Sequence, residues 1–149
     1  MTRVQILTHE FVEYVPEELK DGVVYVSIPY ATVIHKCCCG CGREVVTPLA
    51  PAQWSVTFDG KSISLYPSIG NWNLPCKSHY WIKQNRVLWA AQWSEQQIAA
   101  AQRQDAAAVA HQFAVEQRSD QRTEPVVAAR PTKRKEGRIS RFVKWLLGK

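Results

Sequence analysis

Five cysteines and a histidine are the side chains of this sequence best suited to chemistry. Four of the cysteines crowd into one short glycine-containing segment, and the fifth stands three residues before the histidine: Cys37, Cys38, Cys39, Cys41, Cys76 and His79. A tetrahedral zinc ion can be held by two such segments that the fold brings together, and we expect that neither segment here could hold zinc alone. The spacing therefore predicts a structural zinc site.

The predicted site has five good candidates for about four ligand positions. They are Cys37, Cys39, Cys41, Cys76 and His79. Three alternate thiolates are hard to bring to one ion without strain, so we expect two or three of them to bind together with Cys76. His79 is either a further ligand or a structural histidine at the start of an apolar strand. Cys38 falls outside the alternation of Cys37, Cys39 and Cys41, although it also begins a Cys-x-x-Cys pattern. His35 is at best a spare ligand.

Other interpretations of the cysteines are weaker. Adjacent thiols lie too close together to form several ordinary disulfides, and a segment of cysteine and glycine makes a poor hydrophobic core. A catalytic zinc ion usually has three protein ligands, an open position for water and a carboxylate nearby. Glu44 is the only carboxylate near the cluster, so the thiolate-rich pattern favours a closed structural ion over a metallo-hydrolase.

Short β-branched and aromatic runs separated by turn signals extend from residue 3 to residue 90. Asp59-Gly60 separates two such runs, and an Asp-Gly pair is a strong hairpin signal because glycine accepts a positive φ. Two further hairpins are predicted by the paired runs 80–82 with 87–89 and 32–34 with 45–47, the second with the cysteine segment at its tip. The sequence therefore predicts a small, mainly β, zinc-stabilised antiparallel domain over residues 1–92.

The composition changes after this domain. Residues 93–118 are rich in Ala, Gln and Glu and predict a helix, which Ser94 caps with Gln97 reaching back. The apolar stripe of this helix is thin, so it should pack loosely on the domain or on a partner. Residues 119–137 contain prolines and a basic run and predict a linker. Residues 138–149 carry apolar side chains at helical spacing and predict a short amphipathic basic helix.

The net charge of +6 is concentrated at the C-terminal end. Residues 1–90 hold 8 Lys or Arg against 7 Asp or Glu, whereas residues 130–149 hold 8 against 1. A nearly neutral domain argues against a surface that binds phosphate as a whole, while the basic tail could contact nucleic acid or an anionic membrane. No stretch approaches the roughly 18 apolar residues of a membrane span, and the first residues do not resemble a signal peptide, so we expect a cytoplasmic protein.

One compound motif is specific enough to suggest a family. It joins His35-Lys36-Cys37-x-Cys39-Gly40-Cys41-Gly42, then Asp59-Gly60 and Ser64-Leu65-x-Pro67-Ser68-Ile69-Gly70-Asn71-Trp72, then Cys76-x-Ser78-His79-Tyr80-Trp81-Ile82. Over about residues 3–90 the chain resembles an uncharacterised bacterial family known as a domain of unknown function. Its members look like companions of ubiquitin-like conjugation and phage-defence genes, which encode proteins similar to E1 and E2 enzymes.

The resemblance implies a function, because relatives have been suspected of being peptidases that trim the ubiquitin-like protein. On this interpretation the cysteines hold zinc, while Ser68 and His79 remain for a serine-type peptidase reaction. A Ser-Ile-Gly turn could supply backbone N–H donors to the oxyanion, and Asn71, Asn73 or Asp59 could orient the histidine. The implied partners are a ubiquitin-like protein or E1-like and E2-like enzymes. The composition of the segment around Ser68 is equally typical of an ordinary turn.

A non-catalytic, zinc-stabilised module that binds protein or nucleic acid is the alternative function. Zinc-ordered loops with exposed aromatic residues can stack bases or hold a peptide. The aromatic candidates are Trp54, Trp72, Tyr80 and Trp81. Most of them alternate within predicted strands, which favours a place in the core.

Overall fold

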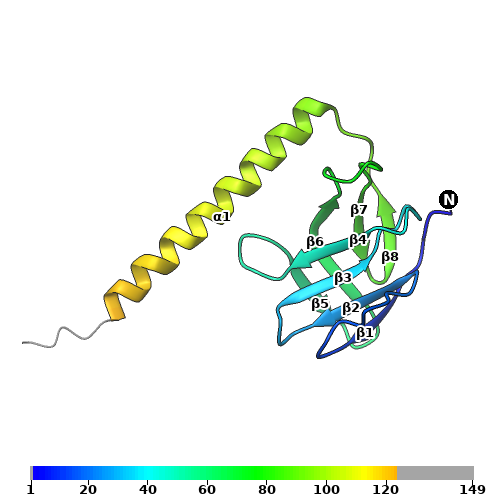
Figure 1. Ribbon diagram of the computed structural model, residues 1–149, viewed down its shortest axis with the longest axis horizontal. Coiled ribbons are helices and arrows are strands. Elements are labelled where there is room, and N and C mark those ends of the chain that lie inside the picture. The colour runs from blue at the N-terminus through cyan, green and yellow to red at the C-terminus, as the bar shows by residue number, and fades with distance from the viewer. Residues whose placement is uncertain (1, 124–149) are drawn as a thin grey trace, which may run out of the picture.

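The computed structural model describes residues 2–123. Within this range the chain forms eight strands and one helix: β1 (Thr8–Phe11), β2 (Val23–Ser27), β3 (Thr32–Lys36), β4 (Glu44–Pro48), β5 (Ser55–Phe58), β6 (Ile63–Gly70), β7 (His79–Lys83), β8 (Arg86–Trp89) and α1 (Glu95–Thr123). The strands form two four-stranded sheets, ordered β1-β2-β3-β4 and β5-β6-β7-β8 (Figure 1). The predicted mainly β fold with a C-terminal helix is confirmed. The predicted basic helix at 138–149 and most of the predicted linker lie outside the described residues.

Antiparallel pairing dominates both sheets, but β1 and β2 run parallel, with Thr8 opposite Val23. The antiparallel prediction is wrong for this pair. A loop over residues 12–22 joins the two strands, and its length lets the chain return to the same edge instead of reversing through a tight turn. Strands joined by a short turn, such as β5 and β6 around Asp59-Gly60, are antiparallel.

The two sheets enclose the main hydrophobic core. Single bridges link one sheet to the other at both sides, Ile6 with Arg86 and Leu49 with Trp54. Alternating side chains of the strands meet between the sheets; the buried ones include Val24, Val26, Val33, Val45, Ile63, Leu65, Ile69, Tyr80, Ile82 and Val87. This core fixes the relative positions of β3, β6 and β7, the strands that carry the candidate site.

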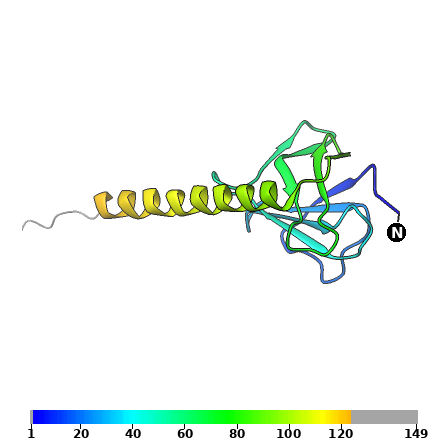
Figure 2. The ribbon, with the colours of Figure 1, turned by 90° about the horizontal axis from the view of Figure 1, so that it is seen from above.

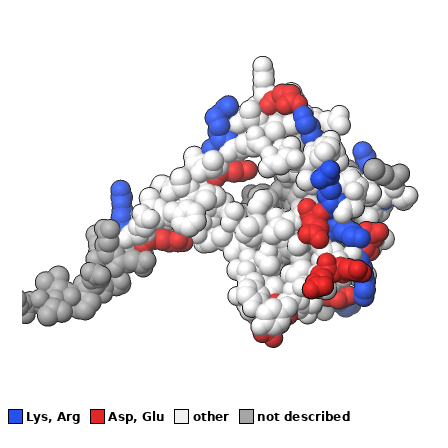
Figure 3. Space-filling view, in the orientation of Figure 1, with Lys and Arg blue, Asp and Glu red and all other residues white. Residues whose placement is uncertain are grey.

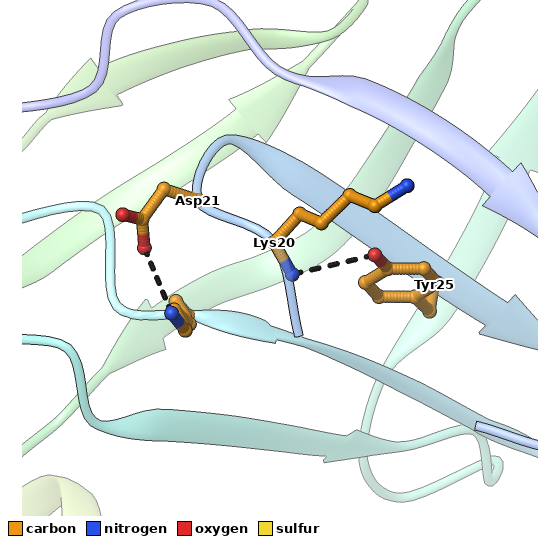
Figure 4. Close-up of polar contacts among 4 residues, drawn as sticks. Lys20, Asp21 and Tyr25 are labelled. Carbon is orange, nitrogen blue, oxygen red and sulfur yellow. Dashed lines mark hydrogen bonds and ion pairs between the residues drawn. The ribbon is translucent and has the colours of Figure 1, made fainter. Parts of the chain in front are cut away.

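Strand β2 is buried on both faces. Its outer side chains Val23 and Tyr25 pack against Leu19 in the preceding loop. The Tyr25 hydroxyl accepts a hydrogen bond from Lys20 N at 3.4 Å (Figure 4). The loop between β1 and β2 therefore covers part of the outer face of the first sheet.

Helix α1 leaves the domain as one long rod (Figures 1 and 2). It begins with the predicted cap: Gln97 N donates to Ser94 Oγ at 3.3 Å, and Ser94 N donates to Gln97 Oε1 at 2.9 Å. The helix continues past the predicted end at Arg118 to Thr123, the last described residue. Of its side chains up to residue 119, only that of Ile98 is buried. No helix in residues 2–123 has the length and apolar content needed to cross a membrane.

Candidate functional site

Two connections between strands bring four thiols together. Cys37, Cys39 and Cys41 lie between β3 and β4, and Cys76 lies between β6 and β7. The four Sγ atoms all lie within 4.8 Å of one another. Their separations include 3.4 Å from Cys37 to Cys39 and 3.9 Å from Cys76 to both Cys37 and Cys41. The structure therefore assembles a group that could hold a metal ion.

The geometry of this group fits tetrahedral thiolate ligation. A zinc–sulfur distance of about 2.3 Å places the sulfurs of a tetrahedral site about 3.8 Å apart, close to the separations of 3.4 and 3.9 Å found here. A disulfide would need two sulfurs at about 2.05 Å, and all five cysteines are free. Within residues 2–123 neither Glu44 nor His79 belongs to the group, so its four potential ligand atoms are all sulfur.

The thiols differ in how easily they ionise. Burial opposes ionisation of Cys76, but hydrogen bonds with Ser78 and the neighbouring thiols more than offset it and lower the pKa of Cys76 to about 7. Burial raises the pKa of Cys37 and raises the pKa of Cys38 to about 12. Cys38 is fully buried in the core and stays a neutral thiol outside the ligand group.

Two polar side chains support the thiols. Ser78 Oγ lies 3.1 Å from Cys37 Sγ and 3.6 Å from Cys76 Sγ. Asn71 Nδ2 donates to Ser78 Oγ at 2.8 Å, although the sequence suggested Asn71 as a partner of the histidine. Hydrogen bonds of this kind orient metal ligands. Sequence reasoning missed Ser78 in this role; its place two residues after Cys76 was the available signal.

Ser68 and His79 lie side by side on the second sheet. Ser68 is near the end of β6, and His79 opens β7, where it pairs with Gly70. The register of these strands shifts between Leu65 and Ile69, and such an irregularity re-aims the neighbouring side chains. Ser68 Oγ lies 2.9 Å from His79 Nε2. The segment around Ser68 is thus an irregular strand and not the turn that its composition suggests.

Three tryptophans surround the imidazole of His79. Their ring centroids lie 4.9 Å (Trp72), 4.6 Å (Trp93) and 5.4 Å (Trp81) from that of His79. Burial lowers the pKa of His79, so its ring is neutral near pH 7, and Nε2 can accept a proton in the tautomer that carries its hydrogen on Nδ1. The other ring nitrogen, Nδ1, is buried without a hydrogen-bond partner among the described residues.

The remaining predicted partners of the histidine lie elsewhere. Asp59 accepts hydrogen bonds within the turn between β5 and β6, and Asn73 Oδ1 accepts one from Gln102 of α1. His35, the spare metal ligand, is fully buried with its Nε2 2.9 Å from the Tyr80 hydroxyl. Burial lowers the pKa of His35 to about 4, so it is a neutral core residue.

The hydroxyl and imidazole open into a cleft of about 360 Å³. Besides Ser68 and His79 its walls are formed by Ala52, Gln53, Trp54, Pro67, Gly70, Trp72, Trp93, Ala101, Gln104, Asp105 and Val109. In the orientation of Figure 3, charged side chains of both signs crowd the side of the domain away from α1. The cleft is within the size range of small-ligand sites.

A serine hydroxyl bonded to a neutral histidine in a cleft is the arrangement of a nucleophile and its base. The family model for the bacterial ubiquitination-like system serine protease, BubE, matches residues 11–90. The chain belongs to the BubE family. This membership supports the predicted link to bacterial ubiquitin-like systems and suggests protein partners. Neither a curated protein nor a solved structure matches the chain.

The BubE match contains the thiol group and the Ser68–His79 pair, but it ends before Trp93 and α1. One wall of the cleft is therefore built outside the matched region. Sequence reasoning missed this wall. The only sequence signal for this wall was the thin apolar stripe of the helix, which does not indicate the surface on which the helix docks.

Proposed function

We propose that this chain is a serine-type peptidase of a bacterial ubiquitin-like conjugation system, with Ser68 as nucleophile and His79 as general base. The 2.9 Å distance between Ser68 Oγ and His79 Nε2 carries the proposal. A serine becomes nucleophilic when a base within hydrogen-bond reach takes its proton. Membership of the BubE family, described as serine proteases, supports the same reaction.

The reaction runs in two halves on this pair. The Ser68 hydroxyl gives its proton to His79 Nε2 while Oγ attacks the scissile carbonyl carbon, and protonated His79 then gives that proton to the leaving amine as the acyl-enzyme forms. In the second half His79 takes a proton from water, whose oxygen attacks the ester. The proton returns to Ser68 Oγ as the acid product leaves. The lowered pKa of His79 keeps Nε2 free to start each half.

Aromatic packing holds the base in place. In a triad, a carboxylate bonded to the second ring nitrogen fixes the histidine. Here Trp72, Trp81 and Trp93 contact the ring, while the pairing of His79 with Gly70 fixes its backbone. The proposed site is therefore a dyad whose orientation comes from packing.

The four clustered thiols hold a structural zinc ion in this proposal. Bound zinc would supply a cross-link between two connections and no chemistry at the scissile bond. Ser78 bonds to two of the thiols and directly precedes His79. Asn71 bonds to Ser78 and directly follows Gly70. The ligand group therefore supports the ends of both strands that carry the dyad.

The proposed substrate is a ubiquitin-like protein encoded beside this chain, and E1-like and E2-like enzymes are further proposed partners. The proposed compartment is the cytoplasm, where five free thiols remain reduced.

The alternative of a non-catalytic binding module has less support. Tyr80 is fully buried and Trp54 and Trp72 are half-buried, which leaves Trp81 as the one exposed member of the aromatic set. The basic tail lies outside the described residues.

Incubation with the neighbouring ubiquitin-like protein tests the proposed function. We expect the wild-type chain to shorten that protein and Ser68→Ala to lower the cleavage rate by a factor on the order of 10⁴. Ser64→Ala is the matched control, because Ser64 lies on the same strand and its Oγ accepts a hydrogen bond from Gln84 N. Cleavage by Ser68→Ala at the wild-type rate would reject the nucleophile.

A further inference from the structure

Helix α1 is anchored on both sides of the cleft. At one side Ile98 is buried. At the other side Gln112 Oε1 accepts a hydrogen bond from Ala52 N at 3.0 Å. Between these anchors, Ala101, Asp105 and Val109 repeat at helical spacing and line the cleft. The helix therefore contributes one wall of the cleft that also contains the dyad.

Asp105 differs from the rest of this wall. Apart from His79, it is the only ionisable side chain that lines the cleft among the described residues. It is exposed, and within residues 2–123 no ion pair or hydrogen bond engages its carboxylate. Ala101 and Val109, one turn away on either side, are small or apolar, whereas Gln104 gives the wall a second, uncharged polar side chain. Asp105 is therefore an exposed carboxylate at the cleft that a charged ligand can reach.

The aromatic residues that line the cleft, like the carboxylate, favour a positively charged ligand. Trp54, Trp72 and Trp93 all line it, and Trp72 stacks on Trp93 with ring centroids 5.3 Å apart. The negative face of an indole attracts a guanidinium or ammonium group. A carboxylate and three indoles in one cleft therefore form a site that suits a cation.

We propose that Asp105 is a specificity-determining residue that binds a basic side chain of the polypeptide substrate next to the scissile bond. The inference rests on the proposed peptidase function, since it requires a polypeptide in the cleft. Arginine fits best, because a planar guanidinium can bond to the carboxylate and stack on an indole at the same time. Asp105 lies outside the residues that the family model matches.

Cleavage of a position-scanning library of short quenched peptides tests the proposal. Each position carries arginine, lysine, neutral citrulline or glutamate in turn. We expect the wild-type chain to cleave peptides with arginine at one position about tenfold faster, in kcat/KM, than those with citrulline. Asp105→Asn should remove this preference and keep the rate on citrulline peptides, and Asp105→Lys should prefer glutamate. Glu116→Gln, which removes a carboxylate of α1 outside the cleft, should behave as wild type.

A binding measurement separates this inference from the proposed function. N-acetyl-arginine methylamide and its citrulline analogue are titrated into Ser68→Ala while the indole N–H signals of Trp54, Trp72 and Trp93 are followed by NMR. The arginine compound alone should shift these signals, and Asp105→Asn in the same background should abolish the shift. Equal shifts with and without Asp105, or an arginine preference in cleavage that survives Asp105→Asn, would overturn the proposal even if Ser68 is the nucleophile. A shift without any cleavage by the wild-type chain would support the cation site and reject the peptidase.

Discussion

His79 touches one hydroxyl and three indole rings, and these contacts decide what it can do as a base. The hydroxyl of Ser68 lies 2.9 Å from Nε2, and burial among the rings lowers the pKa of the imidazole. Burial disfavours the charged form of the ring. The basicity of this histidine is therefore set by its burial, to which the three tryptophans in contact with the ring contribute.

The pH profile of kcat/KM should show this effect. Only neutral His79 can accept the Ser68 proton, so activity falls about tenfold per pH unit below the pKa. Because burial lowers that pKa from 6.5, the midpoint of the acid limb should lie below 6.5. Trp93→Ala exposes the ring and should move the midpoint up towards 6.5. Asp105 lines the same cleft, so the comparison is repeated in Asp105→Asn. A wild-type midpoint above 6.5 would contradict this account.

Gly70 of β6 lies against the indole of Trp72. A Cβ at position 70 would lie 2.3 Å from Trp72 Cε2, so alanine must displace the indole that packs on His79. We expect Gly70→Ala to lower the free energy of unfolding by about 1–3 kcal/mol and to lower kcat. Urea denaturation and steady-state kinetics measure both, and a variant that matches wild type in stability and rate would show that this packing is dispensable.

Residue types alone were informative where the chemistry is local. Three thiols within five residues need little from the fold to meet, so Cys37, Cys39 and Cys41 stand out in the sequence. The distance between Ser68 and His79 is different. It depends on the register shift between Leu65 and Ile69 of β6, for which Pro67 was the available signal, because a proline within a strand indicates an edge or a bulge. The support from Ser78 depends on the same pairing.

At the scale of elements, the connection from β6 to β7 joins the two parts of the site. Residues 71–78 contain a thiol of the ligand group and two side chains that bond to it, and they lie between the strands that carry Ser68 and His79. Structural zinc sites contribute directly to folding free energy. Loss of the metal should therefore loosen the dyad as well as the cysteine loop.

Paired cysteine variants test this link. Cys76→Ser removes a ligand and should abolish zinc in the purified protein, lower the free energy of unfolding by at least about 3 kcal/mol and abolish cleavage. Cys38→Ala, whose thiol is in the core and outside the group, should keep one zinc ion per chain. Metal analysis, urea denaturation and cleavage assays give the three readouts. Full activity in metal-free Cys76→Ser would separate the zinc site from the dyad.

The order of the elements was more predictable than their pairing. Alternating apolar residues and turn residues indicate where strands lie, and Ser94 with Gln97 marks the start of α1. The parallel pairing of β1 with β2 depends on the path of a long loop, which has no local signal. The docking of α1 on the cleft was equally hidden, because its apolar stripe is thin.

At the scale of the whole molecule, the domain and the helix have separate roles. The two sheets enclose a complete core, whereas α1 adds one buried side chain, Ile98. Burial of one isoleucine contributes about 1.5–3 kcal/mol. The domain should therefore fold without the helix.

A chain that ends at Ser94 tests this division. It should unfold cooperatively in urea and bind one zinc ion, with a free energy of unfolding about 1.5–3 kcal/mol below that of the full chain. It should also lose the preference for basic peptides, because Asp105 is gone. Failure of the truncated chain to give a cooperative transition would show that α1 is part of the folding unit.

The proposed function requires Ser68 to be a nucleophile activated by His79. Labelling with a fluorophosphonate followed by peptide mass spectrometry tests this role most directly, because the reagent bonds covalently to an activated serine. We expect one adduct per chain, on Ser68, and its loss in His79→Ala under conditions where both proteins remain folded. An unlabelled wild-type chain, an adduct on another residue, or undiminished labelling of Ser68 in His79→Ala would contradict it.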